Sequence, residues 1–450
     1  MGSVRSLVGA GSAVGFARVF SLLCAAIQLP LLTRVLSTSE FAQVSLAIAI
    51  ATYFSLLSAD PVILGFQRHP GRNDNRANYA FARTRTLIIL TIAALVVVGA
   101  GFFFGYQKEA IAFAGWGIGI SINRIISAAW LMWGRPWQYA WNLLAGTGTR
   151  TFILLLLVLT GCDPLLSLGA AGAASAAAAL VLSPRLHCRQ LNRAPRPWPV
   201  RFGLNLAIAS LAYAALSNGS LLLLSSFTTS GVVGQYAAMS QVAALTSGAV
   251  SGLLFTMSYP RLRLAWDKGH SALVRTDLTT LQLAYLSIAL LSVFFLYVGD
   301  FWLLKFVIPE GFIDGKVLAP LILATGFAAM GEMGSWHHQF GLAAARVALN
   351  TVIAAVLGLV ITIGLAAVFQ EQGAAFGVAL GFLVYFALMR SKTHPSSMTF
   401  SLAVAALVLV GGITQVPSLS NDAVAYAALA AGGIALGLGM RRVRARIRMA

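Results

Sequence analysis

The chain is a succession of about fourteen long apolar stretches separated by short gaps, and this pattern restricts it to a helical fold embedded in a membrane. Each stretch supplies roughly the 20 apolar residues that a helix needs to cross a hydrocarbon core about 30 Å thick. We therefore predict an all-α polytopic membrane protein. The predicted spans are residues 8–33, 40–66, 86–106, 110–131, 138–161, 164–184, 204–227, 232–258, 278–299, 316–338, 348–369, 373–389, 399–415 and 423–440.

Basic residues are distributed unevenly between alternate gaps. If the N-terminus is inside, the inner gaps collect most of the 31 Lys and Arg residues, including a basic segment at 185–203 and a tail at 441–450. Cytoplasmic loops characteristically retain Lys and Arg, so both termini are predicted to be cytoplasmic, which requires an even number of spans. The outer gaps hold only Arg34, Lys108, Lys305 and Lys316.

The formal net charge of +18 does not indicate a nucleic-acid partner. Basic residues spread over several short inner loops are what membrane topology and anionic lipid headgroups select for, so membrane lipids are the expected partners of these residues. Cys24, Cys162 and Cys188 lie in different parts of the chain and form neither a disulfide framework nor a metal-binding set. We expect no cofactor and no metal.

The loops leave no room for catalysis. The longest outer connection, 299–316, carries Asp300, Glu310 and Asp314 without an Asp-x-Asp or similar metal motif. No Gly-rich phosphate loop followed by Lys is present, and no filter-like segment indicates a channel. The sequence therefore predicts a secondary transporter that is not an enzyme and does not use ATP directly.

Loose internal repetition predicts two halves. The stretch Leu36–Arg68 returns about 191 residues later as Phe227–Arg261, each with a Thr-Ser turn, a small-residue-rich span and a basic exit. Such a shift keeps the orientation, so two pseudo-symmetric six-helix lobes would be parallel repeats, with two further C-terminal helices. The predicted divisions are an N-lobe at 1–184, a linker at 185–203, a C-lobe at 204–390, spans 13 and 14 within 391–440, and a tail at 441–450.

Three segments carry a family resemblance: Leu29–Leu57, Ser230–Leu245 and Gln370–Leu388. They resemble the polysaccharide and O-antigen flippases of the multidrug/oligosaccharidyl-lipid/polysaccharide exporter superfamily. Ala42 departs from the usual Gly, and the third motif is permuted. The matching residues are Pro30, Arg34, Leu36, Ser37 and Phe41, then Val233, Gly234, Tyr236, Ala237 and Ala238, and then Gly373, Ala374, Ala375 and Gly377.

The resemblance implies a bacterial inner-membrane protein that moves an undecaprenyl-diphosphate-linked oligosaccharide from the inner to the outer leaflet by alternating access. It also implies other polysaccharide-assembly membrane proteins as candidate partners. One alternative is a multidrug or small-molecule exporter of the same superfamily, which should prefer an acidic or aromatic cavity. A polytopic sugar-transfer enzyme is a second alternative, and the short outer loops argue against it.

Five ionisable residues fall well inside predicted spans: Arg18, Arg124, Arg150, Asp60 and Glu332. Each would cost about 2.5 to 3.5 kcal/mol at a helix centre, so we expect them to face a wet cavity or one another. Two acids cannot neutralise three Arg residues, and guanidinium suits bidentate contacts with phosphate. Arg18, Arg124 and Arg150 are therefore predicted to bind the diphosphate. The alternative is that Arg18 or Arg124 forms a structural ion pair with Asp60.

Asp60 and Glu332 are the candidates for gating or ion coupling. Asp60 precedes Pro61, and proline inside a helix frees a carbonyl group and kinks the chain. A carboxylate in a low-dielectric cavity can also bind a driving ion, for which H+ and Na+ are the candidates. Glu332 competes for this role because His337 and His338 follow it closely.

Overall fold

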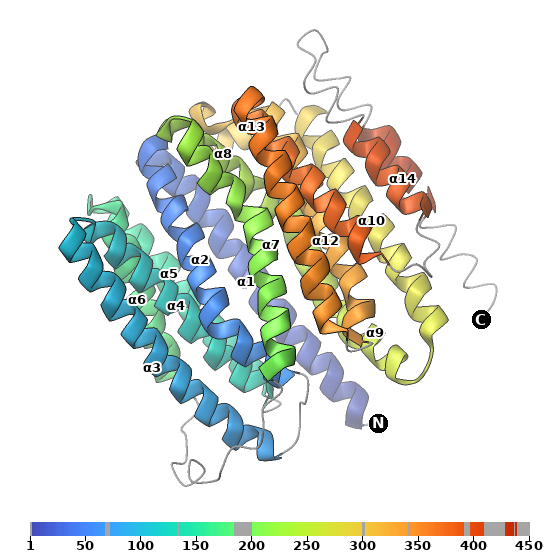
Figure 1. Cartoon of the computed structure of the whole chain (residues 1–450), viewed down its shortest axis with the longest axis horizontal. Helices are drawn as coiled ribbons and strands as arrows, with labels where there is room; N and C mark the ends of the chain where they lie inside the picture. Colours follow the sequence, from blue (N-terminus) through green and yellow to red (C-terminus); the bar gives the residue numbers. More distant parts are fainter. Residues whose placement is uncertain are drawn as a thin grey trace. The chain divides into compact units, whose positions relative to one another are not determined.

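The computed structural model is an all-α polytopic membrane protein (Figure 1). Within the described residues the regular elements are helices, and ten of them are long and apolar enough to cross a membrane. The structure describes residues 2–67, 73–132, 135–183, 200–298, 302–340, 343–390, 397–408, 428–435 and 437–438.

The chain divides into two compact units, Met1–Ala214 and Ala215–Ala450. The boundary falls inside one helix, α7 (Val200–Phe227). Most of the predicted linker at 185–203 and the whole predicted tail at 441–450 lie outside the described residues. The two units are therefore described separately.

The first unit is built around α4. This helix packs against α2, α3, α5 and α6, and α1 packs against α5 (Figure 1). Most ends of these helices lie within a few residues of the predicted spans, because the apolar runs stop at polar turns. The exceptions are two helix starts, since α1 begins at Gly2 and α3 at Asn73, well before the predicted starts at 8 and 86. The helices are α1 (Gly2–Val35), α2 (Thr38–Gln67), α3 (Asn73–Phe104), α4 (Gln107–Met132), α5 (Pro136–Leu159) and α6 (Pro164–Val181).

Glycines allow α4 and α6 to touch backbone to backbone. A Cβ added at Gly115 would collide with the carbonyl oxygen of Gly169, and one at Gly119 would collide with that of Gly172. Small residues three or four apart let membrane helices approach closely in this way. The contact holds α4 in place from one side, so its other faces can carry polar side chains toward α2 and α5.

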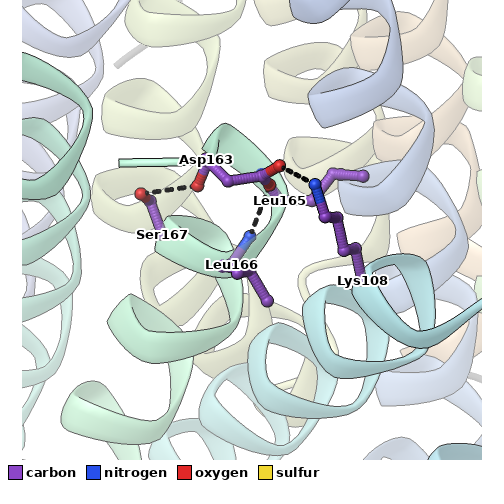
Figure 2. A network of polar contacts seen from close by, with 5 residues as sticks. All are labelled: Lys108, Asp163, Leu165, Leu166 and Ser167. Carbon is purple, nitrogen blue, oxygen red and sulfur yellow. Dashed lines mark hydrogen bonds and ion pairs between the residues drawn. The ribbon is translucent and has the colours of Figure 1, made fainter. Parts of the chain in front are cut away.

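A polar network closes the turn before α6 (Figure 2). Asp163 caps this helix, because its Oδ1 accepts hydrogen bonds from the backbone N–H of Leu165 at 3.0 Å and of Leu166 at 3.2 Å. Its Oδ2 lies 2.6 Å from Nζ of Lys108 at the start of α4. The hydrogen bond from Lys108 holds the pKa of Asp163 below its ordinary value. Two predicted spans are thus joined at their ends by one carboxylate.

The second unit is built around α12. This helix packs most extensively against α13, and also against α8, α9 and α10. Large apolar side chains on α12 are fully buried, among them Phe327, Met330 and Trp336. The remaining elements are α8 (Ser230–Ala243), η2 (Ala244–Gly248), α9 (Ala249–Asp267), α10 (Ser271–Val298), α11 (Trp302–Val307), η3 (Glu310–Phe312), α12 (Gly315–Phe340), α13 (Ala344–Met389) and α14 (Ser397–Ala406).

Two elements of this unit differ from simple predicted spans. The predicted span at 232–258 is interrupted by the π-helix η2, so it consists of α8, η2 and the start of α9. The predicted spans 348–369 and 373–389 are both contained in α13, where Gln370 has a positive φ of 50° and separates two helical segments. Of the last two predicted spans, the structure describes α14 and residues 428–435 and 437–438.

Candidate functional site

An ion pair lies between α2 and α4 in the first unit. Nη2 of Arg124 contacts Oδ1 of Asp60, and the hydroxyl of Ser210 donates a hydrogen bond to the same carboxylate. The Asp60 residue is only 2% exposed, whereas 36% of the Arg124 side chain is exposed. The carboxylate is therefore enclosed, while the guanidinium retains donor groups that can bind something else. Of the two structural pairings considered for Asp60, the structure contains the one with Arg124.

The surroundings of this pair are apolar. A buried apolar cluster includes the chain neighbours of both residues, Ala59 beside Asp60 and Ile125 beside Arg124. Ile63 of α2 and Leu90 of α3 belong to the same cluster. The Asp60 carboxylate is buried, and leaving a buried charge without its partner is strongly unfavourable. Asp60 is thus paired with Arg124 in this conformation. Binding of a driving ion at Asp60 would require the pair to separate.

Arg150 on α5 has a different environment. Its Cζ lies 4.7 Å from the centre of the Trp116 ring on α4, and Trp116 is only 4% exposed. Cys24 of α1 is close to Arg150 and hydrogen-bonds with Thr151. In the part of the chain that the structure describes, no carboxylate forms an ion pair with Arg150. The aromatic ring stabilises the cation without neutralising it.

Arg18 on α1 is exposed and lies within electrostatic range of the Tyr139 hydroxyl on α5. The helices bring the three predicted Arg residues into one unit, since α1 packs against α5 and α5 against α4. Each guanidinium nevertheless has its own environment: Arg124 has a carboxylate, Arg150 has an indole ring, and Arg18 is open to the surroundings.

A buried amide network was missed as a unit by sequence reasoning. Nδ2 of Asn142 donates to Oγ of Ser127 at 2.8 Å, and that hydroxyl lies 3.1 Å from Oδ1 of Asn123. All three side chains are buried. Asn123 and Ser127 are one helical turn apart, and this spacing is the signal that could have revealed a polar stripe on α4 facing α5. The network positions the helix that carries Arg124.

The charges in the second unit are arranged differently. Glu332 lies on α12 and is half-buried, and its backbone carbonyl accepts a hydrogen bond from Oγ of Ser335 at 2.6 Å. Further along α12, the His337 ring meets Trp266 edge-on with 5.0 Å between ring centres. Among the described residues, no three His, Cys, Asp or Glu side chains form a group that could hold a metal ion.

The sequence matches no known family profile and no curated protein. Solved structures are similar to it. The lipid II flippase MurJ in an inward closed conformation superposes with a TM-score of 0.63 at 12% identity, covering 98% of this chain and 100% of that chain.

Transporters of another group are also similar. The Vibrio cholerae MATE transporter VcmN in its bent form gives a TM-score of 0.53 at 12% identity, over 90% of this chain and 98% of its own. An inward-facing multidrug resistance MATE family transporter of the MOP superfamily gives 0.52 at 14% identity, over 89% and 95%. The chain therefore has the fold that these flippase and multidrug transporter structures share.

Proposed function

We propose that the chain is a secondary transporter that flips a lipid-linked oligosaccharide, carried on undecaprenyl diphosphate, from the inner to the outer leaflet. The observation that carries this proposal is the Arg150 guanidinium inside a predicted span of the first unit, which stacks on Trp116 and has no carboxylate in ion-pair contact among the described residues. A cation that costs free energy in a membrane is retained where a ligand supplies the opposite charge. The similarity to a lipid II flippase over nearly the whole chain supports the same proposal.

The chemistry of the first unit suits a diphosphate. Guanidinium groups form paired, charge-assisted hydrogen bonds with phosphate oxygens, which ammonium groups cannot do with the same geometry. Arg150 would supply a positive charge, and Arg124 would supply the donors that Asp60 leaves unused. Arg18 would meet the headgroup from α1. The role of Asp60 would be to orient Arg124, and its separation from Arg124, or protonation of Glu332, would couple transport to H+ or Na+.

The setting follows from the charge distribution and the resemblance. The protein would lie in a bacterial inner membrane with both termini in the cytoplasm, and would receive its cargo from membrane enzymes of polysaccharide assembly. Alternating access without ATP would move the headgroup, while the lipid tail stays in the bilayer.

Reconstitution tests the proposal. Proteoliposomes containing a fluorescent undecaprenyl-diphosphate-linked oligosaccharide should show protein-dependent exposure of the label to a membrane-impermeant quencher. Arg150→Gln should slow this exposure by about tenfold or more, as expected when one charge-assisted contact is lost. Arg150→Lys should lie in between, because the charge stays and the paired geometry is lost.

The matched control is Arg261→Gln, which removes an exposed Arg from α9. Unfolding temperatures of all variants would confirm that Arg150→Gln still folds. If Arg150→Gln flips the lipid as fast as the parent, the proposed role of this guanidinium is wrong. If the parent protein does not flip the lipid at all, the proposed cargo is wrong.

A multidrug exporter is the second candidate, because the aromatic side chains of the second unit fit it. Tyr259 meets Trp336 and Phe340 with ring centres 5.1 and 5.4 Å apart, and Trp266 lies 6.0 Å from Phe340. Aromatic faces bind organic cations. Protein-dependent efflux of a cationic dye, without any flipping of the diphosphate lipid, would favour this candidate.

A further inference from the structure

The inner end of α12 holds a group of titratable side chains that the proposed transport does not use. His337 and His338 are consecutive there, with ring centres 5.8 Å apart. His338 is only 7% exposed, and His337 is half-buried against Trp266 of α9. Helices α9, α10 and α13 all pack against α12. Buried imidazoles need hydrogen-bond partners. The two ring nitrogens of His338 are therefore considered one at a time.

One nitrogen of His338 is satisfied and the other is not. The ring bonds to the backbone carbonyl of Met389, which a protonated Nδ1 can do as the donor. Its Nε2 is buried and has no hydrogen-bond partner within the described residues. With the proton fixed on Nδ1, the neutral ring presents a lone pair at Nε2. This nitrogen becomes a donor only when the ring takes up a second proton.

The charges around the two rings are mostly positive. Arg275 of α10 lies within electrostatic range of His337, and Arg346 of α13 lies within range of His338. The Nε of Arg275 is also buried without a partner among the described residues. Arg263 of α9 stacks over Phe340, with its Cζ 5.5 Å from the ring centre. Three helices thus direct guanidinium groups toward one end of α12.

Among the described residues, few acids lie near these charges. Asp267 is engaged with Arg263, since Oδ2 lies 3.1 Å from Nε of that residue. Glu332 lies more than one turn before His337 on α12, and Asp277 follows Arg275 by two residues on α10. The local balance therefore favours an anion. A metal cation is disfavoured, because Arg275 and Arg346 would repel it and no carboxylate of the described residues joins the two histidines.

We propose that His338 and Arg275, which both lie near His337, form with His337 and Arg346 a binding site for a phosphate group at the predicted cytoplasmic end of α12. Phosphate oxygens would accept hydrogen bonds from Nε of Arg275 and from Nε2 of His338. The second bond requires the imidazolium form, so binding would draw one proton from solvent onto His338. The site goes beyond the proposed cargo transport, since inorganic phosphate or an anionic lipid headgroup could fill it.

The full-length protein in nanodiscs provides the test. In discs of phosphatidylcholine alone, titration with inorganic phosphate should raise the unfolding temperature. At about pH 8.5, where the added phosphate is already a dianion, weakly buffered samples should take up about one proton per bound phosphate. In phosphate-free discs, phosphatidylglycerol retained in native mass spectrometry would instead identify a lipid headgroup as the ligand. Either response in the parent protein, reduced about tenfold or more in His338→Gln and Arg275→Gln, supports the site.

The matched control is Arg390→Gln. Arg390 ends α13 at the same predicted side of the membrane, but its Cζ lies 6.0 Å from the Phe400 ring centre. This variant should bind like the parent. If His338→Gln does not fold, Arg275→Gln and the exposed Arg346→Gln replace it. The proposal fails if neither anion binds the parent protein, if the site variants bind like Arg390→Gln, or if binding takes up no proton. None of these measurements involves the cargo, so they are independent of the flipping assay.

Discussion

Helices α4 and α12 each form the centre of one unit, yet they are stabilised in different ways. α4 touches α6 through glycine backbones, and turns an ion pair and an amide network toward α2 and α5. α12 instead buries Phe327, Met330 and Trp336 in an apolar and aromatic environment. The central helix of the first unit therefore has charged and polar side chains in its buried contacts, whereas that of the second unit has large apolar ones.

The difference teaches where ligand chemistry can occur within a membrane. A helix that is held closely on one face by glycines can tolerate polar groups on another, because the polar groups are not needed for its packing. Helix α12, which is stabilised by bulky side chains, carries its two neighbouring histidines, His337 and His338, in its last turn. The following experiments test this contrast, beginning with the largest expected effect.

Removing Arg124 should be the most damaging change. Arg124→Gln leaves the buried Asp60 carboxylate without its cation, and should lower the free energy of unfolding by about 3 kcal/mol. The double variant Asp60→Asn/Arg124→Gln should recover part of this loss, because no charge is left unpaired. Thermal unfolding in detergent measures both. Equal stability of the single and double variants would show that the Asp60 carboxylate carries no cost when it is left without Arg124.

Crowding the α4–α6 contact should come next. Gly115→Ala places a methyl group against the Gly169 carbonyl, and should lower the free energy of unfolding by about 2 kcal/mol. Gly99→Ala on α3 is the control, since nothing lies within 4 Å of the added Cβ. Denaturant or thermal unfolding of the two variants compares them directly. Similar stabilities would mean that α4 does not depend on this close approach.

A buried hydroxyl in the second unit should matter less. Tyr236 on α8 donates a hydrogen bond to Oγ of Ser220 at 2.8 Å, and both side chains are buried. Tyr236→Phe should lower the free energy of unfolding by about 1 kcal/mol, part of which Ser220→Ala should restore in the double variant. Thermal unfolding of the three variants gives the coupling. A loss as large as that of Arg124→Gln would contradict the contrast between the units.

The smallest effect should come from Lys108 and Asp163. The pKa of Asp163 is lowered in the folded protein, so its stabilising contribution is present above the unfolded pKa of about 3.9 and is lost as the pH falls through the folded value. The stability difference between the parent and Lys108→Gln should therefore shrink as the pH is lowered from about 6 to 3. Salt should also reduce it, since the pair is partly exposed. A difference that is constant with pH would assign it to another interaction of Lys108.

The sequence predicted the helices more completely than their contacts. Apolar length and turn residues placed α4, α5, α6 and α12 to within a few residues, because membrane thickness sets these limits. Hydropathy cannot reveal the π-helix at 244–248 or the positive φ of Gln370, since both are backbone geometries with ordinary apolar flanks.

The charged residues could be predicted as a set but not as partners. The free-energy cost of placing a charge in lipid identifies these residues in the sequence. Two ion pairs with Asp60 were expected as alternatives, one with Arg18 and one with Arg124. Stacking of Arg150 on Trp116 depends on how α4 and α5 face each other, which residue types alone do not determine. The roles of all five residues in transport, Arg18, Arg124, Arg150, Asp60 and Glu332, stay predictions.

The π-helix η2 determines which face of α9 meets its neighbours. A π-turn holds one more residue than an α-turn, so everything after it is rotated by about 100° relative to an uninterrupted helix. Deleting one residue at 244–248 would therefore turn Trp266 and Arg263 away from His337 and Phe340. The direction in which Arg263 and Trp266 point from α9 thus depends on a single additional residue in η2, more than a dozen positions before them in the chain.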